Sequence, residues 1–296
     1  MILKQCDSKQ ETLNTLKQLL KDSNNDKQRS LISRDLNLLK SGIESEQENA
    51  YYIDFYLKKS QNIIVLHDIR IEHKGRTAQI DHILISRLGI ELLESKSFKG
   101  KLTIKEDASL EVLDNNKTLS YPNPLEQSKR HADVLREFIK DNFHFAKRVD
   151  LLGGFNIKSV VLINPKTPVT NQTLPNQFFR ADAYISKRSE ELDRISFIKT
   201  LQLISTMVNI ETVKELANLI KDTHTPINFD YKNKYKISNL SNKVQDISNN
   251  EEMLTEGSPC PFCQKKLVIR NGNNNTTFLG CSGFPKCRFN RSIKQI

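Results

Sequence analysis

Two groups of residues in this sequence have types and spacings suited to chemistry, and the first is a set of four cysteines. Cys260 and Cys263 form a C-x2-C pair, 17 residues separate this pair from Cys281, and Cys287 completes a C-x5-C pair. Two thiolates separated by two residues can both point at one tetrahedral ion, and an intervening hairpin returns the second pair. The spacing therefore predicts a structural Zn²⁺ site, with a disulfide framework as the weaker alternative.

The segment that carries these cysteines is strongly basic. From Ser258 to Ile296 there are seven cations and no acidic residue, so seven of the net ten positive charges lie there. Such a segment is too short to hold a core without a metal, so the ion would stabilise its fold. A basic segment attached to a nearly neutral remainder of the chain indicates binding to an anionic polymer such as nucleic acid. A solvated, solubilising tail is the alternative.

Aromatic residues alternate with the cations in this segment, which suits base stacking beside phosphate contacts. Some phenylalanines must instead form the small core of the segment, and Phe278 is the first candidate for that position. The expected DNA-binding residues are Lys265, Lys266, Arg270, Phe284, Lys286, Arg288, Phe289 and Arg291.

The second group consists of three charged residues in an apolar hairpin, QIDHILISRLGIELLESKSFKG, residues 79–100. Burying Asp81, Glu94 and Lys96 without compensation would be costly. Because side chains alternate along a strand, Glu94 and Lys96 share a face, and a turn near Gly89 can bring Asp81 beside Glu94. Two such carboxylates repel each other unless a divalent cation lies between them, and oxygen ligands suit Mg²⁺ or Mn²⁺. We favour a metal site, with Lys96 near a bound water or phosphate, over a structural ion pair.

The elements that must position these residues follow from the apolar pattern. Residues 8–58 are predicted to be helical with a break at 23–26, and further helices are expected at about 125–143, 195–205 and 213–220. Strands are expected at 62–71, across the hairpin, and at 101–104, 110–113, 117–121, 157–164 and 182–186. This order predicts an α/β fold with a mixed sheet flanked by helices, plus a small C-terminal zinc ribbon.

We expect four parts along the chain. These are a helical N-terminal extension (1–40), a catalytic domain (41–222), an Asn-, Ser- and Lys-rich linker (223–257) and the ribbon (258–296). No apolar run approaches the roughly 18 residues of a membrane span, and MILKQCDSKQ lacks the apolar core of a signal peptide. A cytoplasmic, nucleoid-associated protein without a membrane partner is expected.

The words "QIDHILI", "LLESKSFKG" and "NPLEQ" resemble the nuclease-related domain (NERD) family of PD-(D/E)-x-K nucleases, over roughly residues 41–139. The resemblance implies a restriction-endonuclease-like sheet in which Asp81, Glu94 and the backbone carbonyl of Ser95 hold Mg²⁺. It also implies that Glu46 and Gln127 join the catalytic residues. Ile80 stands in place of the Pro in the pattern, and Ser95 replaces a usually apolar residue or Thr.

Helical spacing supports Glu46 independently, because it heads an inward stripe with Ala50, Ile53 and Leu57. An acidic charge favoured by the helix dipole is the alternative for Glu46. Gln127 could equally cap the helix that follows Pro124.

The run "FLGCSGFPKCRF" resembles the C-terminal zinc-ribbon repeat of bacterial type IA topoisomerases, which holds single-stranded DNA. No stretch resembles their tyrosine-bearing strand-passage core, so the chain is not expected to be a topoisomerase by itself. His67, His73, His82 and His144 lack ligand spacing, and His82 should face away from the site. Cys6 is expected to be unpaired and structural.

Together these observations predict a Mg²⁺-dependent deoxyribonuclease that a zinc ribbon holds on DNA, with single-stranded DNA or DNA with single-stranded regions as the expected partner. By analogy with the superfamily, the products would carry 5′-phosphate and 3′-hydroxyl ends. An inactive DNA-binding module, or an adaptor in repair or in defence against foreign DNA, is the alternative. In an adaptor, the helical residues 8–40 could bind a protein partner.

Overall fold

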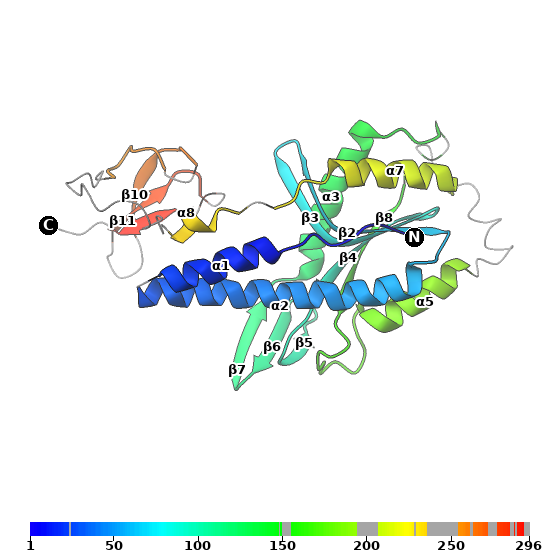
Figure 1. Cartoon of the computed structure of the whole chain (residues 1–296), viewed down its shortest axis with the longest axis horizontal. Coiled ribbons are helices and arrows are strands. Elements are labelled where there is room, and N and C mark those ends of the chain that lie inside the picture. Colours follow the sequence, from blue (N-terminus) through cyan, green and yellow to red (C-terminus); the bar gives the residue numbers. More distant parts are fainter. Residues whose placement is uncertain are drawn as a thin grey trace. The chain divides into compact units, whose positions relative to one another are not determined.

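The chain divides into two units, Met1–Ser238 and Asn239–Ile296, each with its own apolar core (Figure 1). This computed structural model describes residues 1–23, 25–147, 149, 155–193, 207–227, 229–235, 254–260, 263–271, 277–284, 287 and 289–292.

A mixed sheet forms the centre of the first unit and confirms the predicted fold class. Its order is β1-β2-β3-β4-β8-β9, with antiparallel pairs from β2 to β4 and parallel pairs elsewhere. The strands are β1 (Ile2–Lys4), β2 (Ile63–His73), β3 (Arg76–Ser86), β4 (Gly89–Lys96), β8 (Ile157–Ile163) and β9 (Phe178–Arg180).

Helices cover both faces of this sheet (Figure 1). On one face, Ile83 and Leu92 pack beneath α3 (Pro124–Asn142) and α7 (Ile210–Thr223). On the other, Leu84 and Leu93 pack with Ile53 of α2 (Asp26–Leu57) and with α5 (Ala181–Asp193). The alternation of strand side chains thus buries the β3–β4 hairpin on both sides, as its apolar sequence requires.

The turn between β3 and β4 needs the glycine at position 89. Gly89 has a φ of +148°, and a Cβ there would lie 2.5 Å from the carbonyl oxygen of Asn156. Only glycine tolerates this conformation and this approach without strain. The turn fixes the register that pairs Ile85 with Ile90 and Ile83 with Leu92.

Asparagine side chains begin the two longest helices. The Asn25 side chain accepts a hydrogen bond from the Gln28 N–H at 3.1 Å, so the predicted break at 23–26 lies where α2 starts. The Asn123 side chain accepts from the Leu125 N–H at 2.8 Å, with Pro124 in the first turn of α3.

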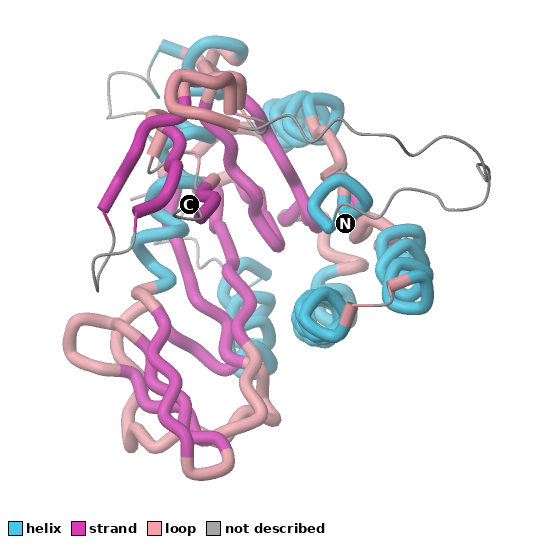
Figure 2. Tube along the Cα trace, turned by 90° about the vertical axis from the view of Figure 1, so that its left-hand side faces the viewer, coloured by secondary structure: helices cyan, strands magenta, loops and turns pink. Residues whose placement is uncertain are grey.

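Two smaller assemblies complete the first unit. Helix α1 (Gln10–Asp22) lies beside α2, and Figure 2 shows the pair nearly end-on. Leu16 and Ile32 pack between the two helices, together with Tyr235 of α8 (Tyr231–Tyr235). The predicted strands β5 (Lys101–Ile104), β6 (Leu110–Asp114) and β7 (Lys117–Tyr121) form an antiparallel sheet that is separate from the main one.

Some predicted elements differ from the structure. Residues 182–186 were predicted as a strand, but they lie in α5, because Ala181 and Ile185 are one helical turn apart and both face the sheet. The short strands β1 and β9 escaped prediction. The boundary expected at residue 40 falls inside α2, and the helix predicted at 195–205 lies outside the described residues.

The segment predicted as a linker from residue 223 begins with residues that pack on the first unit. His224 contacts Asp7 at 2.8 Å, and the Tyr235 hydroxyl donates to Asp35 at 2.6 Å. The first unit accordingly extends to Ser238.

In the second unit, β10 (Leu267–Asn271), β11 (Thr277–Cys281) and β12 (Asn290–Ser292) form an antiparallel sheet in that order. Leu267 and Leu279 join Cys260 and Cys281 in its core. No helix among the described residues of either unit is long and apolar enough to cross a membrane.

Candidate active site and metal centre

The structure brings Asp81, Glu94 and Lys96 together at one end of the β3–β4 pair. His82 lies opposite Leu93, so the same register one step further places Asp81 opposite Glu94. Asp81 Oδ2 accepts a hydrogen bond from the Ser95 N–H at 2.7 Å, and Lys96 Nζ lies 2.7 Å from Glu94 Oε1. Glu94 is only 5% exposed, so the two strands hold this carboxylate where solvent screens it poorly.

Glu46 of α2 adds a third carboxylate to this cluster. Burial raises the pKa of Asp81 well above its ordinary value, and the nearby Glu94 and Glu46 raise it further. Burial likewise raises the pKa of Glu46, and the neighbouring Asp68 and Glu94 add to that effect against Lys9. Burial and the two neighbouring carboxylates thus disfavour the ionised form of Asp81, and a bound cation would favour it.

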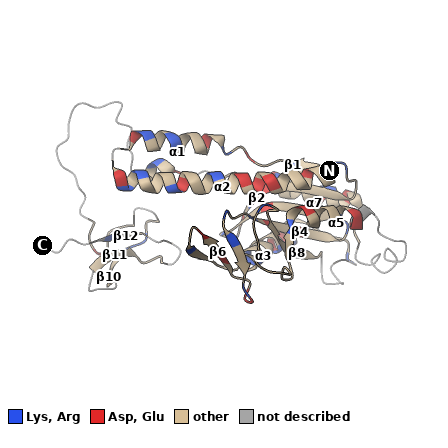
Figure 3. Cartoon of the chain, turned by 90° about the horizontal axis from the view of Figure 1, so that it is seen from below, with Lys and Arg blue, Asp and Glu red and all other residues tan. Residues whose placement is uncertain are grey.

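The helix-dipole explanation for Glu46 is wrong, because this residue lies in the middle of α2 and not in its first turn. Figure 3 shows acidic positions gathered in this middle part of α2. Glu48, two residues further along α2, pairs with Lys166 and Asn164 instead of joining the cluster.

Lys9 and Asp68 belong to the same cluster, although sequence reasoning named neither. Lys9 Nζ lies 2.7 Å from Glu46 Oε2 and 3.3 Å from Asp68 Oδ2. Asp68 interrupts the apolar strand 62–71 just as Asp81 interrupts the hairpin, so its burial could have indicated a site. Lys9 precedes a helix on a polar segment and carries no such signal.

A cleft of about 420 Å³ gives access to the carboxylates. Asp81, Glu94 and Lys96 line it together with residues of α2 and of the β5–β7 sheet, including Tyr121. The hydroxyl oxygen of Ser45, on the α2 side, is buried without a hydrogen-bond partner among the described residues. Paired carboxylate oxygens and an unpartnered hydroxyl form a hard oxygen donor set, so the residues present fit a hydrated Mg²⁺ or Mn²⁺ ion.

Helix α3 borders the same site through the face that carries Gln127. The capping alternative for Gln127 is wrong, because Asn123 caps this helix. Gln127 is half-buried and lies one turn before His131. Burial lowers the pKa of His131, and the charges of Glu94 and Lys96 act on it in opposite directions. These charges place His131 near Glu94 and Lys96, whereas no described contact joins Gln127 to the carboxylates, so the catalytic role of Gln127 stays a prediction.

Four polar residues form a hydrogen-bonded chain behind the site, on the sheet face that α2 covers. Asp54 Oδ1 lies 3.0 Å from His67 Nε2, the two Nδ1 atoms of His67 and His82 are 2.7 Å apart, and His82 Nε2 lies 3.0 Å from Ser95 Oγ. An ionised carboxylate only accepts hydrogen bonds, so with neutral rings each group in the chain donates toward Asp54, beginning with the Ser95 hydroxyl.

This hydrogen-bonded chain holds Ser95, the residue between Glu94 and Lys96, in place. Ser95 donates to Asp81 through its N–H and contacts His82 through its hydroxyl, so both of these groups hold the serine in place. His82 faces away from the carboxylates, as expected, and contacts them only through Ser95.

His82 should contribute a loss of stability in mildly acidic solution, because this residue is buried uncharged. Burial first, and then His67 and Lys9, lower the pKa of His82 well below its ordinary value. Below about pH 6.5, His82 binds a proton in the unfolded chain but stays uncharged in the folded protein. The contribution of His82 to the free energy of unfolding should therefore decrease as the pH falls below that value, by about 1.4 kcal/mol per pH unit for this proton.

Urea unfolding over this range, followed through tyrosine circular dichroism, measures the effect. His82→Asn should show a clearly smaller pH slope, whereas substitution of the exposed His144 should keep the slope of the parent protein. Equal slopes in the two variants would contradict the assignment to His82.

The second unit brings its four cysteines into one cluster. Among the described residues, the Sγ atoms of Cys260, Cys263, Cys281 and Cys287 all lie within 4.8 Å of one another, and all four thiols are free of disulfides. The Cys260–Cys287 sulfur separation is 3.7 Å, close to the roughly 3.8 Å that a tetrahedral Zn²⁺ with bonds of ~2.3 Å requires.

Backbone amides support this cluster. The Gly283 N–H donates to Cys281 Sγ at 3.2 Å, and the Lys265 N–H lowers the pKa of Cys263 to about 7. A Cβ at Gly283 would lie 3.3 Å from that sulfur, which explains the glycine. The cluster supports a structural zinc ion as predicted.

Each chain should contain one zinc ion, and substituting any of the four cysteines should release it and unfold the second unit. A structural Zn²⁺ contributes on the order of 10–16 kcal/mol to folding of such modules. Elemental analysis measures the zinc, and Cys6→Ala is the matched control that should retain it. Zinc-free protein with its cysteines oxidised in pairs would contradict the assignment.

One face of the ribbon sheet carries the residues suited to DNA. Arg270 pairs with Phe278 across β10 and β11, and the Arg270 guanidinium lies 5.7 Å from the ring centre of Phe284, which is 59% exposed. Lys265 and Lys266 are exposed near this strand pair. Stacked aromatic and cationic groups of this kind suit unpaired bases and phosphates.

Phe278 was expected in the ribbon core and Phe289 on the DNA-binding face, but the structure shows the reverse arrangement. Phe289 packs against the cysteine core, whereas Phe278 lies outside the described core on the Arg270 face. Strand alternation separates Phe278 from the buried Leu279, and this register was not evident from sequence. Arg291 is exposed on β12, while Lys286 and Arg288 lie outside the described residues.

A mixed sheet with an acidic and lysine cluster, joined to a four-cysteine ribbon, defines a DNA-binding, nuclease-like protein. Two family models match the chain accordingly: the nuclease-related domain at residues 41–164, and the topoisomerase DNA-binding C4 zinc finger at residues 257–296. The chain therefore combines a nuclease-related domain with a topoisomerase-type zinc finger, as the resemblances implied.

One curated relative is "DNA topoisomerase 1" from Mycoplasma genitalium, which is 22% identical over 200 residues. The match covers 64% of this chain and 25% of the relative, so the chain spans about a quarter of that protein. No solved structure matches the chain significantly.

Proposed function

We propose that this protein is a metal-dependent deoxyribonuclease that hydrolyses phosphodiester bonds and is held on DNA by its zinc ribbon. The observation that carries the proposal is the set formed by Asp81, Glu94 and Lys96, which adjacent strands hold at the base of one cleft. Burial of two opposed carboxylates is costly unless a cation compensates them.

Asp81, Glu94 and the carbonyl oxygen of Ser95 would hold the Mg²⁺ or Mn²⁺ ion. When bound, the ion supplies Lewis acidity toward a phosphoryl oxygen and lowers the pKa of a coordinated water. The hydrogen bond from the Ser95 N–H orients Asp81 for this role, and the chain through His82 to Asp54 fixes Ser95 itself.

Lys96 would act on the attacking water and on the phosphate. Its ammonium group lies 2.7 Å from Glu94, so it is already oriented toward the carboxylates. There it can hold the water that attacks phosphorus and can stabilise the negative charge that develops on the phosphoryl oxygens. The new phosphorus–oxygen bond forms as the bond to the 3′ oxygen breaks, and the products carry 5′-phosphate and 3′-hydroxyl ends.

The ribbon would provide affinity rather than chemistry. Its exposed Phe284 and its cations favour single-stranded DNA, or duplexes with unpaired regions, and binding of this kind would associate the protein with the nucleoid. Catalysis and tethering would then belong to separate units of the chain.

A cleavage assay with Mg²⁺, with Mn²⁺ and without added ions, on single-stranded, duplex and nicked DNA, tests the proposal. We expect ion-dependent cleavage that Glu94→Gln removes and that Glu126→Gln, an exposed change on α3, leaves intact. If the parent protein cuts none of these substrates, or if Glu94→Gln cuts normally, the adaptor alternative becomes the better one.

A further inference from the structure

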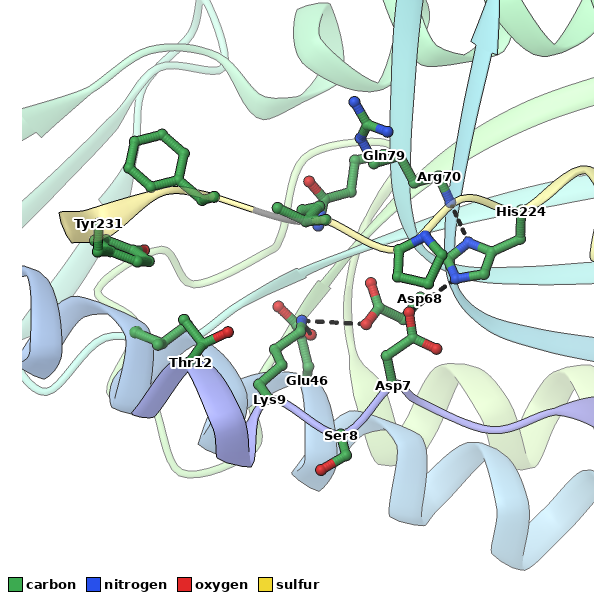
Figure 4. A pocket seen from close by; sticks show the side chains of 14 residues that line it. Asp7, Ser8, Lys9, Thr12, Glu46, Asp68, Arg70, Gln79, His224 and Tyr231 are labelled. Atoms are coloured by element: carbon green, nitrogen blue, oxygen red, sulfur yellow. Dashed lines mark hydrogen bonds and ion pairs between the residues drawn. The ribbon is translucent and has the colours of Figure 1, made fainter. Parts of the chain in front are cut away.

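Lys9 places a positive charge inside the carboxylate cluster from a part of the chain outside the nuclease-related match, which begins at residue 41. Its Nζ atom lies between Glu46 at 2.7 Å and Asp68 at 3.3 Å, and its side chain is 19% exposed (Figure 4). Glu46 and Asp68 are the two carboxylates of the cluster that do not belong to the Asp81–Glu94–Lys96 set.

The segment that delivers Lys9 is anchored on both sides. Strand β1 pairs in parallel with β2, and Lys4 Nζ donates to the carbonyl oxygens of His67 and Asp68, at 3.0 Å each. Lys4 also lies 2.8 Å from Asp7, which contacts His224 in turn. Lys9 therefore has a fixed position, because the residues before it are bound to the sheet and to the segment after α7.

Asp68 adopts an unfavourable backbone conformation at this contact. Its φ is +50°, in the left-handed region that non-glycine residues rarely enter. It stands between the paired residues His67–His82 and Ile69–Ile80, so the conformation occurs within a strand and not in a turn. Strain of this kind persists only where the surroundings enforce it, and here it accompanies the contact with Lys9.

The charges of the cluster are consistent with one divalent ion. With an ion bound, the cluster would set four carboxylates, those of Asp81, Glu94, Glu46 and Asp68, against the two ammonium groups of Lys96 and Lys9. The remainder of two negative charges is what one Mg²⁺ or Mn²⁺ ion neutralises. A second divalent ion would leave two unbalanced positive charges in a poorly solvated site.

We propose that Lys9 is a permanent cation of this active site, which occupies the position that a second divalent ion would take between Glu46 and Asp68. The inference rests on the proposed function for the first ion at Asp81 and Glu94. If Lys9 has this role, the enzyme works with one divalent ion, and the N-terminal segment contributes a residue to the active site.

Removing the Lys9 side chain should open this position. A cavity of about 250 Å³ is lined by Lys9, Glu46 and Asp68 among others, so it adjoins these ion pairs (Figure 4). This cavity offers room for a hydrated ion to reach the freed carboxylates.

The test counts Mn²⁺ ions on zinc-loaded protein by calorimetry and electron paramagnetic resonance. The parent protein should bind one Mn²⁺ per chain. Lys9→Ala and Lys9→Gln should bind two, with the spin coupling expected of ions about 3.5–4 Å apart. Adding Glu46→Gln to Lys9→Ala should restore a single ion. Lys17→Ala, an exposed change of equal charge on α1, should still bind one.

The outcomes separate the two proposals. Two ions on the parent protein, one ion on both folded Lys9 variants, or a second ion without spin coupling would overturn the role of Lys9. If Asp81→Asn keeps the single Mn²⁺ ion of the parent protein, the assignment of the catalytic ion fails instead. Tyrosine circular dichroism shows which variants are folded.

Discussion

Alanine at Asp81 or Glu94 is expected to abolish metal-dependent cleavage and to remove the stabilisation that Mg²⁺ gives to the first unit. At about 100 times its dissociation constant, Mg²⁺ stabilises the folded parent protein by roughly 2.7 kcal/mol. For a unit of this size, that stabilisation corresponds to a rise of about 5–10 °C in Tm.

Without metal, the same two variants should melt at the parent temperature or a few degrees above it. Each change removes one of two opposed carboxylates, and the burial and mutual repulsion of this pair raise the pKa of Asp81. Lys96→Ala should also lose cleavage, by about 10²-fold or more, but it should keep the Mg²⁺-induced stabilisation because both carboxylates remain.

The tyrosines make this measurement specific. All seven tyrosines lie within residues 1–238 and the chain has no tryptophan, so near-ultraviolet circular dichroism follows the first unit alone. Asp133→Ala, an exposed change on α3, is the matched control. Robust cleavage by the Glu94→Ala protein would refute the assignment of the site.

Strand alternation alone predicted the meeting of the hairpin charges. An apolar hairpin with a glycine turn has few registers that bury all its isoleucines and leucines, and the observed one also sets Asp81 opposite Glu94. The zinc centre was also predictable from local sequence, because each cysteine pair lies within a short segment whose spacing is visible in the sequence.

The remaining parts of the site depend on contacts that no local pattern encodes. Lys9 reaches Glu46 across 37 positions of sequence, and the Asp54–His67–His82–Ser95 chain joins four separate elements. Each histidine looked isolated in sequence because its partners lie on other strands or on α2. Only the pairing of β2 with β3 shows that His67 and His82 face each other.

Two errors have one physical cause. Residues 182–186 contain strand-forming Tyr184 and Ile185, and Phe278 is an aromatic residue beside a buried leucine, so local preference favoured a strand and a core position. In both cases, packing against another element decided the outcome. Ala181 and Ile185 fit the sheet as a helix, and Phe289 fills the ribbon core that Phe278 was expected to fill.

Removing the ribbon, residues 258–296, should weaken DNA binding most strongly at low salt and leave the chemistry intact. Seven cations without an acidic partner in residues 258–296 could neutralise about three to five phosphates, each contributing roughly 0.7 to the salt slope on single strands. The slope of log K against log salt should then fall by about 2 to 3.5.

Between 50 and 200 mM salt, that change in slope corresponds to on the order of 20- to 100-fold in affinity. The smaller value is expected, because four zinc-bound thiolates carry more negative charge than the ion neutralises. Cleavage at saturating DNA should persist, since Asp81, Glu94 and Lys96 all lie in the first unit.

A charge variant of the full chain tests the same role without removing the ribbon. Lys265→Gln with Lys266→Gln changes two exposed cations near the Arg270 face and should lower the slope by roughly 1.4. Lys17→Gln with Lys214→Gln makes an equal change on the surface of the first unit and should alter the slope little. If the shortened chain and the Lys265–Lys266 variant both keep the parent slope, the ribbon does not tether the nuclease to DNA, and contact with a protein partner becomes its better role.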